Sequence, residues 1–242
     1  MLLKACLNGP RLPGEHPALP VSAGQLAAAT VSALAAGADA VHVHPKDSRG
    51  HDTLDAITVA SVLEAVRVAA PGTPVGVTTG AWAAAGPAQR LAAVRGWQVL
   101  PDFASVNWHE PGAHELATEL MERGVGVEAG LWTPLAVESW RDWSRRGDCL
   151  RVLLEVVDDL AEEAAVSAAG RLVAALGTTP EVPVLLHGEG RSAWPVLDEA
   201  VRRGFDARIG LEDVLLLPDG RRAADNAELV ATARLAITRA VG

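Results

Sequence analysis

A regular alternation of short apolar segments with longer amphipathic ones limits the possible folds of this chain more than any other feature. The apolar segments predict β-strands at residues 2–7, 39–45, 74–80, 103–108, 125–132, 149–157, 182–188 and 206–213. A helical pattern follows each strand, and strands rich in Val, Leu and Ile are typical of a parallel sheet buried on both faces. Eight such units in 242 residues predict one (β/α)₈ TIM barrel spanning residues 1–242. A doubly wound open sheet is the alternative.

The charge and cysteine content exclude several classes of protein. A formal net charge of −9 argues against the basic face that nucleic-acid binding requires, although local arginines still permit a small anionic ligand. The two cysteines, Cys6 and Cys149, form no CxxC pair, which favours a reducing cytoplasm. The N-terminal apolar run is too short for a signal peptide, and no run reaches the roughly 20 residues of a membrane span. We therefore expect a cytoplasmic protein that binds neither nucleic acid nor membranes.

Polar residues inside the predicted strands gather in their C-terminal halves. In a TIM barrel this end of the strands carries the active site. A purely structural sheet would not concentrate polar groups there, because burying them without partners costs free energy. The sequence therefore predicts a functional site built from the strand ends and the loops that follow them.

The second strand ends in two histidines, His42 and His44. Residues i and i+2 of a strand point to the same side, so both imidazoles face the barrel axis if Val41 and Val43 pack outward. They then lie about 6–7 Å apart along the strand, a separation that lets them converge on one ion. The alternative is a pair of hydrogen-bonded histidines near a loop.

A carboxylate would complete such a metal site. Glu212, at the end of the last predicted strand, is the first candidate, since two histidines and one carboxylate leave positions open for water or substrate. Glu155 and Glu189 are alternatives. Arg208 lies four residues before Glu212, so we expect it to share strand parity and to pair with Glu212, with Asp213 or with a substrate anion.

Three further features lie near the strand ends. The segment Gly188-Glu189-Gly190-Arg191 predicts either an anion site, as often found after strands seven and eight of such barrels, or simply a tight turn. The tryptophans that follow strands three to five suggest an aromatic wall; they are Trp82, Trp108 and Trp132. Lys46 and Asp47 are expected to form a solvated turn.

Four segments together resemble the β-keto acid cleavage enzymes: GADAVHVHPKD, VTTG, FASVNW and RIGLEDVLLLPDGRRAADNAELV. The resemblance implies a zinc-dependent TIM barrel that converts a β-keto acid and acetyl-CoA into acetoacetate and a new acyl-CoA by Claisen-type exchange. It also implies one Zn²⁺ per chain, acetyl-CoA as co-substrate and a homo-oligomer, either a dimer or a tetramer.

The resemblance also assigns roles to single residues. The implied metal ligands are His42, His44 and Glu212. The implied catalytic residues are Arg208, Asp213, Glu128, Thr78 and Ser105, with the general base open between Asp213 and Glu128. The candidate substrate-binding residues are Arg11, Asn107, Trp108, Gly188, Gly190 and Arg191.

The first loop departs from the family pattern. Its NGPR segment places Arg11 where relatives with an amine-bearing substrate have a glutamate, so we expect an anionic or neutral substituent on the substrate. A metallohydrolase of the amidohydrolase type is the alternative function, disfavoured because strands five and six contain no histidine. A non-catalytic barrel that binds CoA or a metal is a third possibility.

Overall fold

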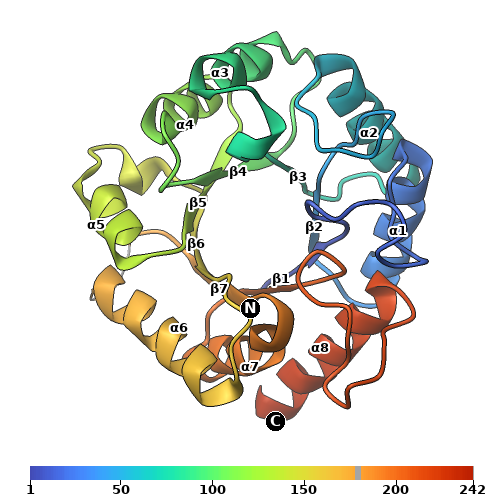
Figure 1. The fold of residues 1–242 in the computed structure, drawn as a ribbon, viewed down its shortest axis with the longest axis vertical. Helices are drawn as coiled ribbons and strands as arrows, with labels where there is room; N and C mark the ends of the chain where they lie inside the picture. Colours follow the sequence, from blue (N-terminus) through green and yellow to red (C-terminus); the bar gives the residue numbers. More distant parts are fainter. Residues whose placement is uncertain (178–180, 242) are drawn as a thin grey trace.

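Eight parallel strands form a barrel with helices around its outside (Figure 1). The computed structural model describes residues 1–177 and 181–241. The strands are β1 (Leu3–Cys6), β2 (Ala40–Val43), β3 (Val75–Thr78), β4 (Phe103–Asn107), β5 (Gly126–Leu131), β6 (Arg151–Val156), β7 (Val184–Gly188) and β8 (Ala207–Ile209). The helices are α1 (Ala23–Ala35), α2 (Ala56–Ala69), α3 (Pro87–Gly96), α4 (Ala113–Glu122), α5 (Pro134–Asp142), α6 (Glu162–Leu176), α7 (Ala193–Arg203) and α8 (Asn226–Val241). The predicted TIM barrel is confirmed.

The sheet closes through its two end strands. The hydrogen-bonded order runs β7-β6-β5-β4-β3-β2-β1-β8, and a parallel bridge between Leu185 and Asp206 joins β7 to the start of β8. Closure satisfies backbone groups that an open sheet edge would leave unpaired. Because β1 pairs with both β2 and β8, the C-terminal ends of β2 and β8 lie close together on either side of it. The candidate site forms at this place.

Alternation along the strands separates an apolar outer layer from a polar interior. Val41 and Val43 are fully buried in the core between the barrel and the helices, whereas His42 and His44 line a cavity inside it. The predicted parity of β2 is therefore confirmed. At the N-terminal end of α1, Ser22 and Gln25 form a reciprocal capping box of a kind that contributes about 1 kcal/mol.

The last strand is shorter than predicted. It ends at Ile209, and Glu212 reaches the cavity from a tight turn that begins at Gly210, so the expected strand parity between Arg208 and Glu212 is wrong. The turn follows from close contact, because a Cβ atom on Gly210 would lie 2.0 Å from the carbonyl oxygen of Cys6. Only glycine allows the two backbones to pass at this distance.

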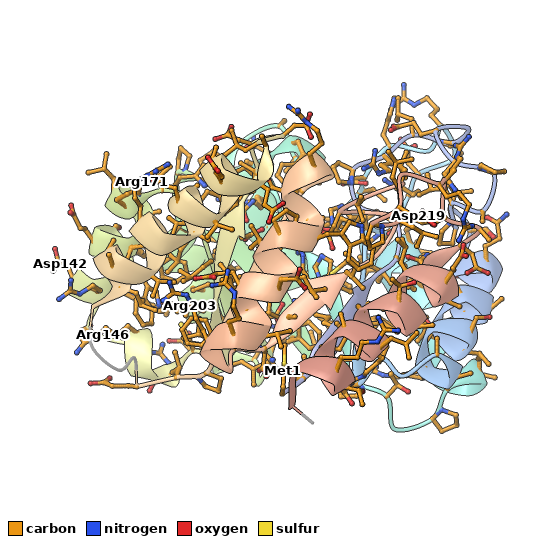
Figure 2. The ribbon with its side chains drawn as sticks, turned by 90° about the horizontal axis from the view of Figure 1, so that it is seen from below. Met1, Asp142, Arg146, Arg171, Arg203 and Asp219 are labelled. Atoms are coloured by element: carbon orange, nitrogen blue, oxygen red, sulfur yellow. The ribbon has the colours of Figure 1, made fainter. Side chains whose placement is uncertain are left out.

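The loops that follow the strands gather at one end of the barrel. In Figure 2, Met1 lies at the lower edge, where the strands begin, and Asp219 of the β8–α8 loop lies in the upper part.

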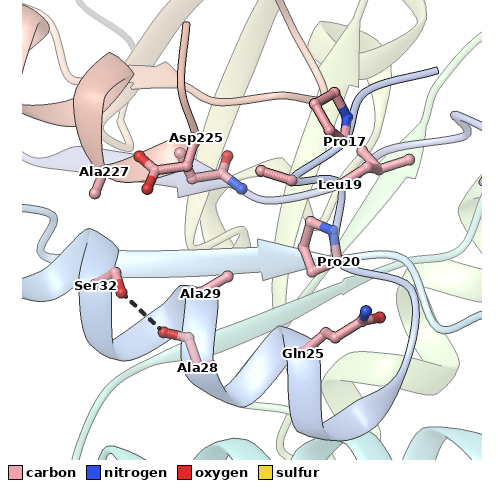
Figure 3. Close-up of a pocket in the computed structure, with 11 residues that line it drawn as sticks. Pro17, Leu19, Pro20, Gln25, Ala28, Ala29, Ser32, Asp225 and Ala227 are labelled. Carbon is pink, nitrogen blue, oxygen red and sulfur yellow. Dashed lines mark hydrogen bonds between the residues drawn. The ribbon is translucent and has the colours of Figure 1, made fainter. Parts of the chain in front are cut away.

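A small surface hollow of about 290 Å³ lies beside the β1–α1 loop, between Pro20 of that loop, Ser32 of α1 and Asp225 before α8 (Figure 3). It contains none of the candidate site residues. No helix in the described part of the chain is both long and apolar enough to cross a membrane.

Candidate active site

A cavity of about 390 Å³ lies at the C-terminal ends of the strands. It brings together seven of the predicted site residues, namely His42, His44, Thr78, Ser105, Asn107, Arg208 and Glu212. The remaining lining residues are Pro10, Trp82, Trp132, Glu155, Val157 and Glu189. The lining thus includes residues from the ends of all the strands or from the loops that follow them, and β7 contributes through Glu189, the residue directly after it. This is the place that the barrel architecture predicts for chemistry.

Two histidines and one glutamate form a cluster at one side of this cavity. Ligand atoms of His42, His44 and Glu212 all lie within 4.8 Å of one another, and His44 Nε2 lies 3.6 Å from Glu212 Oε2. Donors bound to one ion at about 2.0–2.2 Å are separated by about 3–4 Å. A small closure of these side chains would therefore place all three on a single cation.

The unpaired atoms of the cluster fit a cation. His42 Nδ1 and Glu212 Oε2 are buried and have no hydrogen-bond partner. Burial holds the pKa of His42 well below its usual value, so its ring is neutral and offers a lone pair. Burial would also lower the pKa of His44, but the charges of Glu212 and Asp52 outweigh it and raise this pKa to about 9. A cation on His44 Nε2 would take the place of that proton.

Asp52 orients the second histidine and was missed in the sequence. Its carboxylate lies 2.7 Å from His44 Nδ1, which leaves only Nε2 of that ring for an ion. It also accepts hydrogen bonds from Lys46 Nζ at 2.5 Å and from the Trp82 indole N–H at 2.7 Å. A carboxylate on the distal nitrogen of a histidine is the usual outer shell of a metal site.

The loop after β2 therefore supports the site. Lys46 is only 7% exposed, and besides Asp52 it donates to the carbonyls of Gly9 and Arg11 at 2.6 and 3.0 Å. The expectation of a solvated turn is wrong for Lys46. An antiparallel bridge between Lys46 and Asp52 folds the loop back onto itself, which carries the carboxylate to the histidine.

Arg208 links the metal cluster to a second group of buried acids. Its Nη2 lies 2.7 Å from Asp213 Oδ1 and 3.0 Å from Glu212 Oε1. Burial raises the pKa of Asp213 despite the neighbouring guanidinium, whereas Arg208 and the two histidines hold the pKa of Glu212 well below its usual value. His187 Nε2 donates a 2.9 Å hydrogen bond to Glu155 Oε2, and His187 Nδ1 lies 3.7 Å from Asp213 Oδ1.

Glu128 lies one layer deeper than the cavity. It is fully buried, forms an ion pair with Lys4, and its Oε1 lies 3.1 Å from Arg151 Nε. Arg151 in turn pairs with Asp206 at the N-terminal end of β8. Glu128 is therefore absent from the lining of the cavity and belongs to an ionic network inside the barrel.

Two predicted substrate-binding residues, Arg11 and Trp108, do not line the cavity. Trp108 points toward the helices, with its ring 5.2 Å from that of Trp143. Arg11 turns outward, donates to the Leu211 carbonyl at 2.5 Å and pairs with Glu15 at 3.2 Å. In its place Pro10 lines the cavity.

The backbone N–H groups of the glycine-rich segment already have partners. Gly190 donates to the Asp213 carbonyl at 2.8 Å, and Arg191 donates to the Asp159 carboxylate at 2.6 Å. The Arg191 side chain is 67% exposed and also contacts Asp159. Gly188 packs against the start of α7, where a Cβ atom would lie 2.6 Å from the Ser192 carbonyl oxygen. Arg191, but not these amides, is thus free to meet a ligand beyond Asp159.

A larger groove of about 930 Å³ adjoins the cavity. Its lining includes Arg11, Arg191, Trp194 and a row of leucines, at positions 160, 215, 216 and 217. The lining residues of the two hollows are close neighbours in the chain. Positions 10, 157 and 189 line the cavity, and positions 11, 159 and 190 line the groove. The groove therefore lies at the same end of the barrel as the cavity, beside its β1, β6 and β7 loops.

The fold and this cluster define a class: TIM-barrel proteins with a candidate His-His-Glu metal centre among the loops at the C-terminal end of the barrel. Within that class, the model of the beta-keto acid cleavage enzymes, BKACE, matches residues 1–242, and the chain belongs to this family. The resemblance predicted from the sequence is confirmed.

Comparisons with individual proteins agree with the family. The chain is 24% identical to 3-keto-5-aminohexanoate cleavage enzyme of Fusobacterium nucleatum subsp. nucleatum, over 95% of this chain and 88% of that protein. A complex of ObcA with a C4-CoA adduct and oxalate has the same fold, with a TM-score of 0.74 and 16% identity over 92% of this chain. This chain spans only 64% of that ObcA chain. Type I 3-dehydroquinate dehydratase from Clostridium difficile shares the barrel with a TM-score of 0.64 and 11% identity, over 98% of this chain and 92% of that one.

Proposed function

We propose that the protein is a zinc-dependent enzyme that converts a β-keto acid and acetyl-CoA into acetoacetate and an acyl-CoA. The observation that carries this proposal is the convergence of His42, His44 and Glu212 beside Arg208 in the barrel mouth. Two imidazoles and a carboxylate suit Zn²⁺, and one ion per chain satisfies the unpaired atoms of the cluster. When bound there, the ion would supply Lewis-acid polarisation of the keto acid.

The exchange makes one carbon–carbon bond and breaks another. The α-carbon of the keto acid loses a proton and bonds to the acetyl carbonyl carbon, while CoA leaves as the thiolate. The thiolate then adds to the original keto carbon, whose bond to the α-carbon breaks. The α-carbon regains a proton, and acetoacetate and the new acyl-CoA are released.

The side chains around the cluster suit these steps. A carboxylate must accept the α-proton, and of the two predicted bases we favour Asp213, because it contacts Arg208 beside the cluster and burial raises its pKa. Glu128 is held between two buried cations away from the cavity. The Arg208 guanidinium and the hydroxyls of Thr78 and Ser105 line the cavity, where they would stabilise the oxyanions that form.

The adjoining groove suits coenzyme A. ObcA forms a complex with a C4-CoA adduct and oxalate, and here a groove that contains four leucines lies beside the cavity. Arg11 and Arg191 at this groove are the candidates for phosphate contacts, which arginine makes with charge-assisted hydrogen bonds. The metallohydrolase alternative gains no support, because β5 and β6 carry no histidine among their described residues.

A substrate panel tests the proposal. The zinc-loaded protein is incubated with β-keto acids and acetyl-CoA, and acetoacetate and new acyl-CoA are measured by mass spectrometry. Equal amounts of both products are expected. Free acid without a new acyl-CoA would refute the exchange. Light scattering tests the expected dimer or tetramer.

A further inference from the structure

A buried histidine beside the cavity has no role in the bond changes of the proposed reaction. His187 is the fourth residue of β7, is 1% exposed, and is not among the residues that line the cavity. It pairs in register with Glu155 of β6, and the residues before each of them, Leu186 and Leu154, are fully buried in the apolar core. Alternation along the strands therefore turns His187 and Glu155 together toward the barrel interior.

Glu155 determines which ring nitrogen of His187 carries a proton. Its Oε2 lies 2.9 Å from His187 Nε2. Burial alone would raise the pKa of Glu155, but the hydrogen bond and charge of His187, the charge of Arg208 and the indole N–H of Trp132 hold this pKa below its usual value. An ionised carboxylate only accepts hydrogen bonds, so Nε2 is the protonated nitrogen.

The other ring nitrogen of His187 faces the Asp213 carboxyl group. His187 Nδ1 lies 3.7 Å from Asp213 Oδ1, and in the described structure both Nδ1 and Asp213 Oδ2 are buried without a hydrogen-bond partner. Asp213 Oδ1 is held by Arg208, at 2.7 Å from Nη2 and 3.1 Å from Nε. A proton between the ring and the carboxyl group would draw them to about 2.7–3.2 Å, so the wider separation fits a bare Nδ1 opposite a carboxylate.

The backbone anchors Asp213 to the loop that follows His187. The Gly190 N–H donates to the Asp213 carbonyl at 2.8 Å, and the Asp213 N–H donates to the Gly210 carbonyl at 2.9 Å. Asp213 is therefore held from both sides of the barrel seam, and a small rotation of its side chain is enough to reach His187. Hydrogen bonds between catalytic groups are often long before the substrate binds and shorten in the substrate complex.

The same arrangement of a carboxylate and a histidine occurs at the metal cluster. There Asp52 binds one ring nitrogen of His44 and leaves the other for an ion. Glu155 binds one ring nitrogen of His187 and leaves the other for Asp213. A carboxylate on one nitrogen fixes the tautomer and the orientation of the ring, and so determines what the second nitrogen can do.

We propose that His187 is a positioning residue for the general base, and that its Nδ1 accepts a hydrogen bond from Asp213 once that carboxyl group has taken the α-proton of the β-keto acid. This inference rests on the proposed function, because the proton comes from the carbon that forms the new bond. The C–H bond breaks, its electron pair stays on the α-carbon, and the proton moves to Asp213 Oδ2. His187 keeps its own proton on Nε2 and stays neutral, and it holds the Asp213 O–H in place until the α-carbon takes the proton back.

Deuterium uptake at C2 of acetoacetate tests this inference. Acetoacetate is the one β-keto acid that the proposed reaction specifies, and its C2 protons are those that Asp213 would move. The zinc-loaded protein is placed in D₂O with acetoacetate and without any CoA ester. Proton NMR follows the loss of the C2 signal relative to a protein-free sample that contains the same zinc. Rates at several acetoacetate concentrations give kcat and KM for the deuterium uptake.

Two substitutions separate the two nitrogens of the ring. Glutamine reaches the position of Nε2 and keeps the donor for Glu155, whereas asparagine keeps an acceptor at the position of Nδ1. His187→Gln should lower kcat about 10- to 100-fold with KM within about twofold, because the buried O–H of Asp213 loses its partner. His187→Asn should stay within about fivefold of the wild-type kcat, since it keeps that partner. His114→Gln on α4, where the ring contacts Ser139, is the control and should change neither constant.

The zinc Kd and circular dichroism of each variant should match the wild type, since His187 is not part of the metal cluster. Wild-type rates in both His187 variants, or equal losses in both, would overturn the inference, while acyl-CoA formation by the wild type would still support the reaction. Deuterium uptake that falls in His187→Gln alone supports the inference even if the substrate panel yields no acyl-CoA, and that combination would overturn only the proposed reaction. No uptake by the wild type above the protein-free rate would overturn the inference together with the proposed base.

Discussion

Replacing Asp52 with Asn tests whether the outer shell of the cluster controls metal binding. The carboxylate makes three contacts, with His44 Nδ1 at 2.7 Å, Lys46 Nζ at 2.5 Å and Trp82 Nε1 at 2.7 Å. The amide keeps one acceptor oxygen but loses the charge. Loss of such an outer-shell partner weakens metal binding by about 10- to 100-fold, or about 1.4–2.8 kcal/mol. We expect a change of this size in the Kd for Zn²⁺.

The variant should remain folded, because Lys46 keeps the carbonyls of Gly9 and Arg11 as acceptors. Competition with a chromophoric zinc chelator measures the Kd, and circular dichroism checks the fold. Asp142→Asn, on the exposed surface of α5, is the matched control and should bind zinc as the wild type does. A Kd within twofold of the wild type for Asp52→Asn would refute the role of this carboxylate.

Three further changes test the framework of the site. Glu128→Gln leaves Lys4 without its buried counter-charge and Arg151 with Asp206 alone, so urea unfolding should show a loss of about 3–5 kcal/mol, and a loss under 1 kcal/mol would contradict the ionic network. Gly210→Ala would place its Cβ atom 2.0 Å from the Cys6 carbonyl oxygen, so the backbones must move apart at a cost of about 2 kcal/mol or more, with weaker zinc binding; unchanged zinc affinity would contradict the turn geometry. For Glu189, a pKa of about 8 means that the native state keeps a proton which the unfolded chain releases near pH 4.5. Native stability therefore falls from pH 4.5 to 8, and Glu189→Gln should remove up to about 5 kcal/mol of that fall, whereas identical pH profiles of unfolding would contradict it.

The part of the site that lies on strands could be predicted from sequence because strand periodicity is local. The order Val41-His42-Val43-His44 alternates along β2. The two valines pack outward, so the two histidines face inward. The same rule applied to β4 would have shown that Asn107 and Trp108 cannot both face the cavity. The structure confirms this, because Asn107 lines the cavity and Trp108 packs against Trp143.

The part that lies on loops could not be predicted, because its direction depends on distant contacts. Asp52 is carried to His44 by a loop whose bridge forms only after folding. Arg11 is turned outward by the Leu211 carbonyl, which lies 200 positions away in the chain. Glu212 lies in the turn after β8, so strand periodicity could not predict the direction of its side chain. Its place at the end of the last predicted strand and the family resemblance both pointed to Glu212, although strand periodicity misjudged its geometry.

The most direct test of the proposed exchange follows the fate of the acetyl group. The zinc-loaded protein is supplied with an unlabelled β-keto acid and acetyl-CoA that carries ¹³C at both acetyl carbons, and the products are examined by NMR. The proposed bond changes predict acetoacetate labelled only at its keto carbon and methyl group, together with an unlabelled acyl-CoA. Unlabelled acetoacetate, or label in the acyl-CoA, would contradict the proposed function.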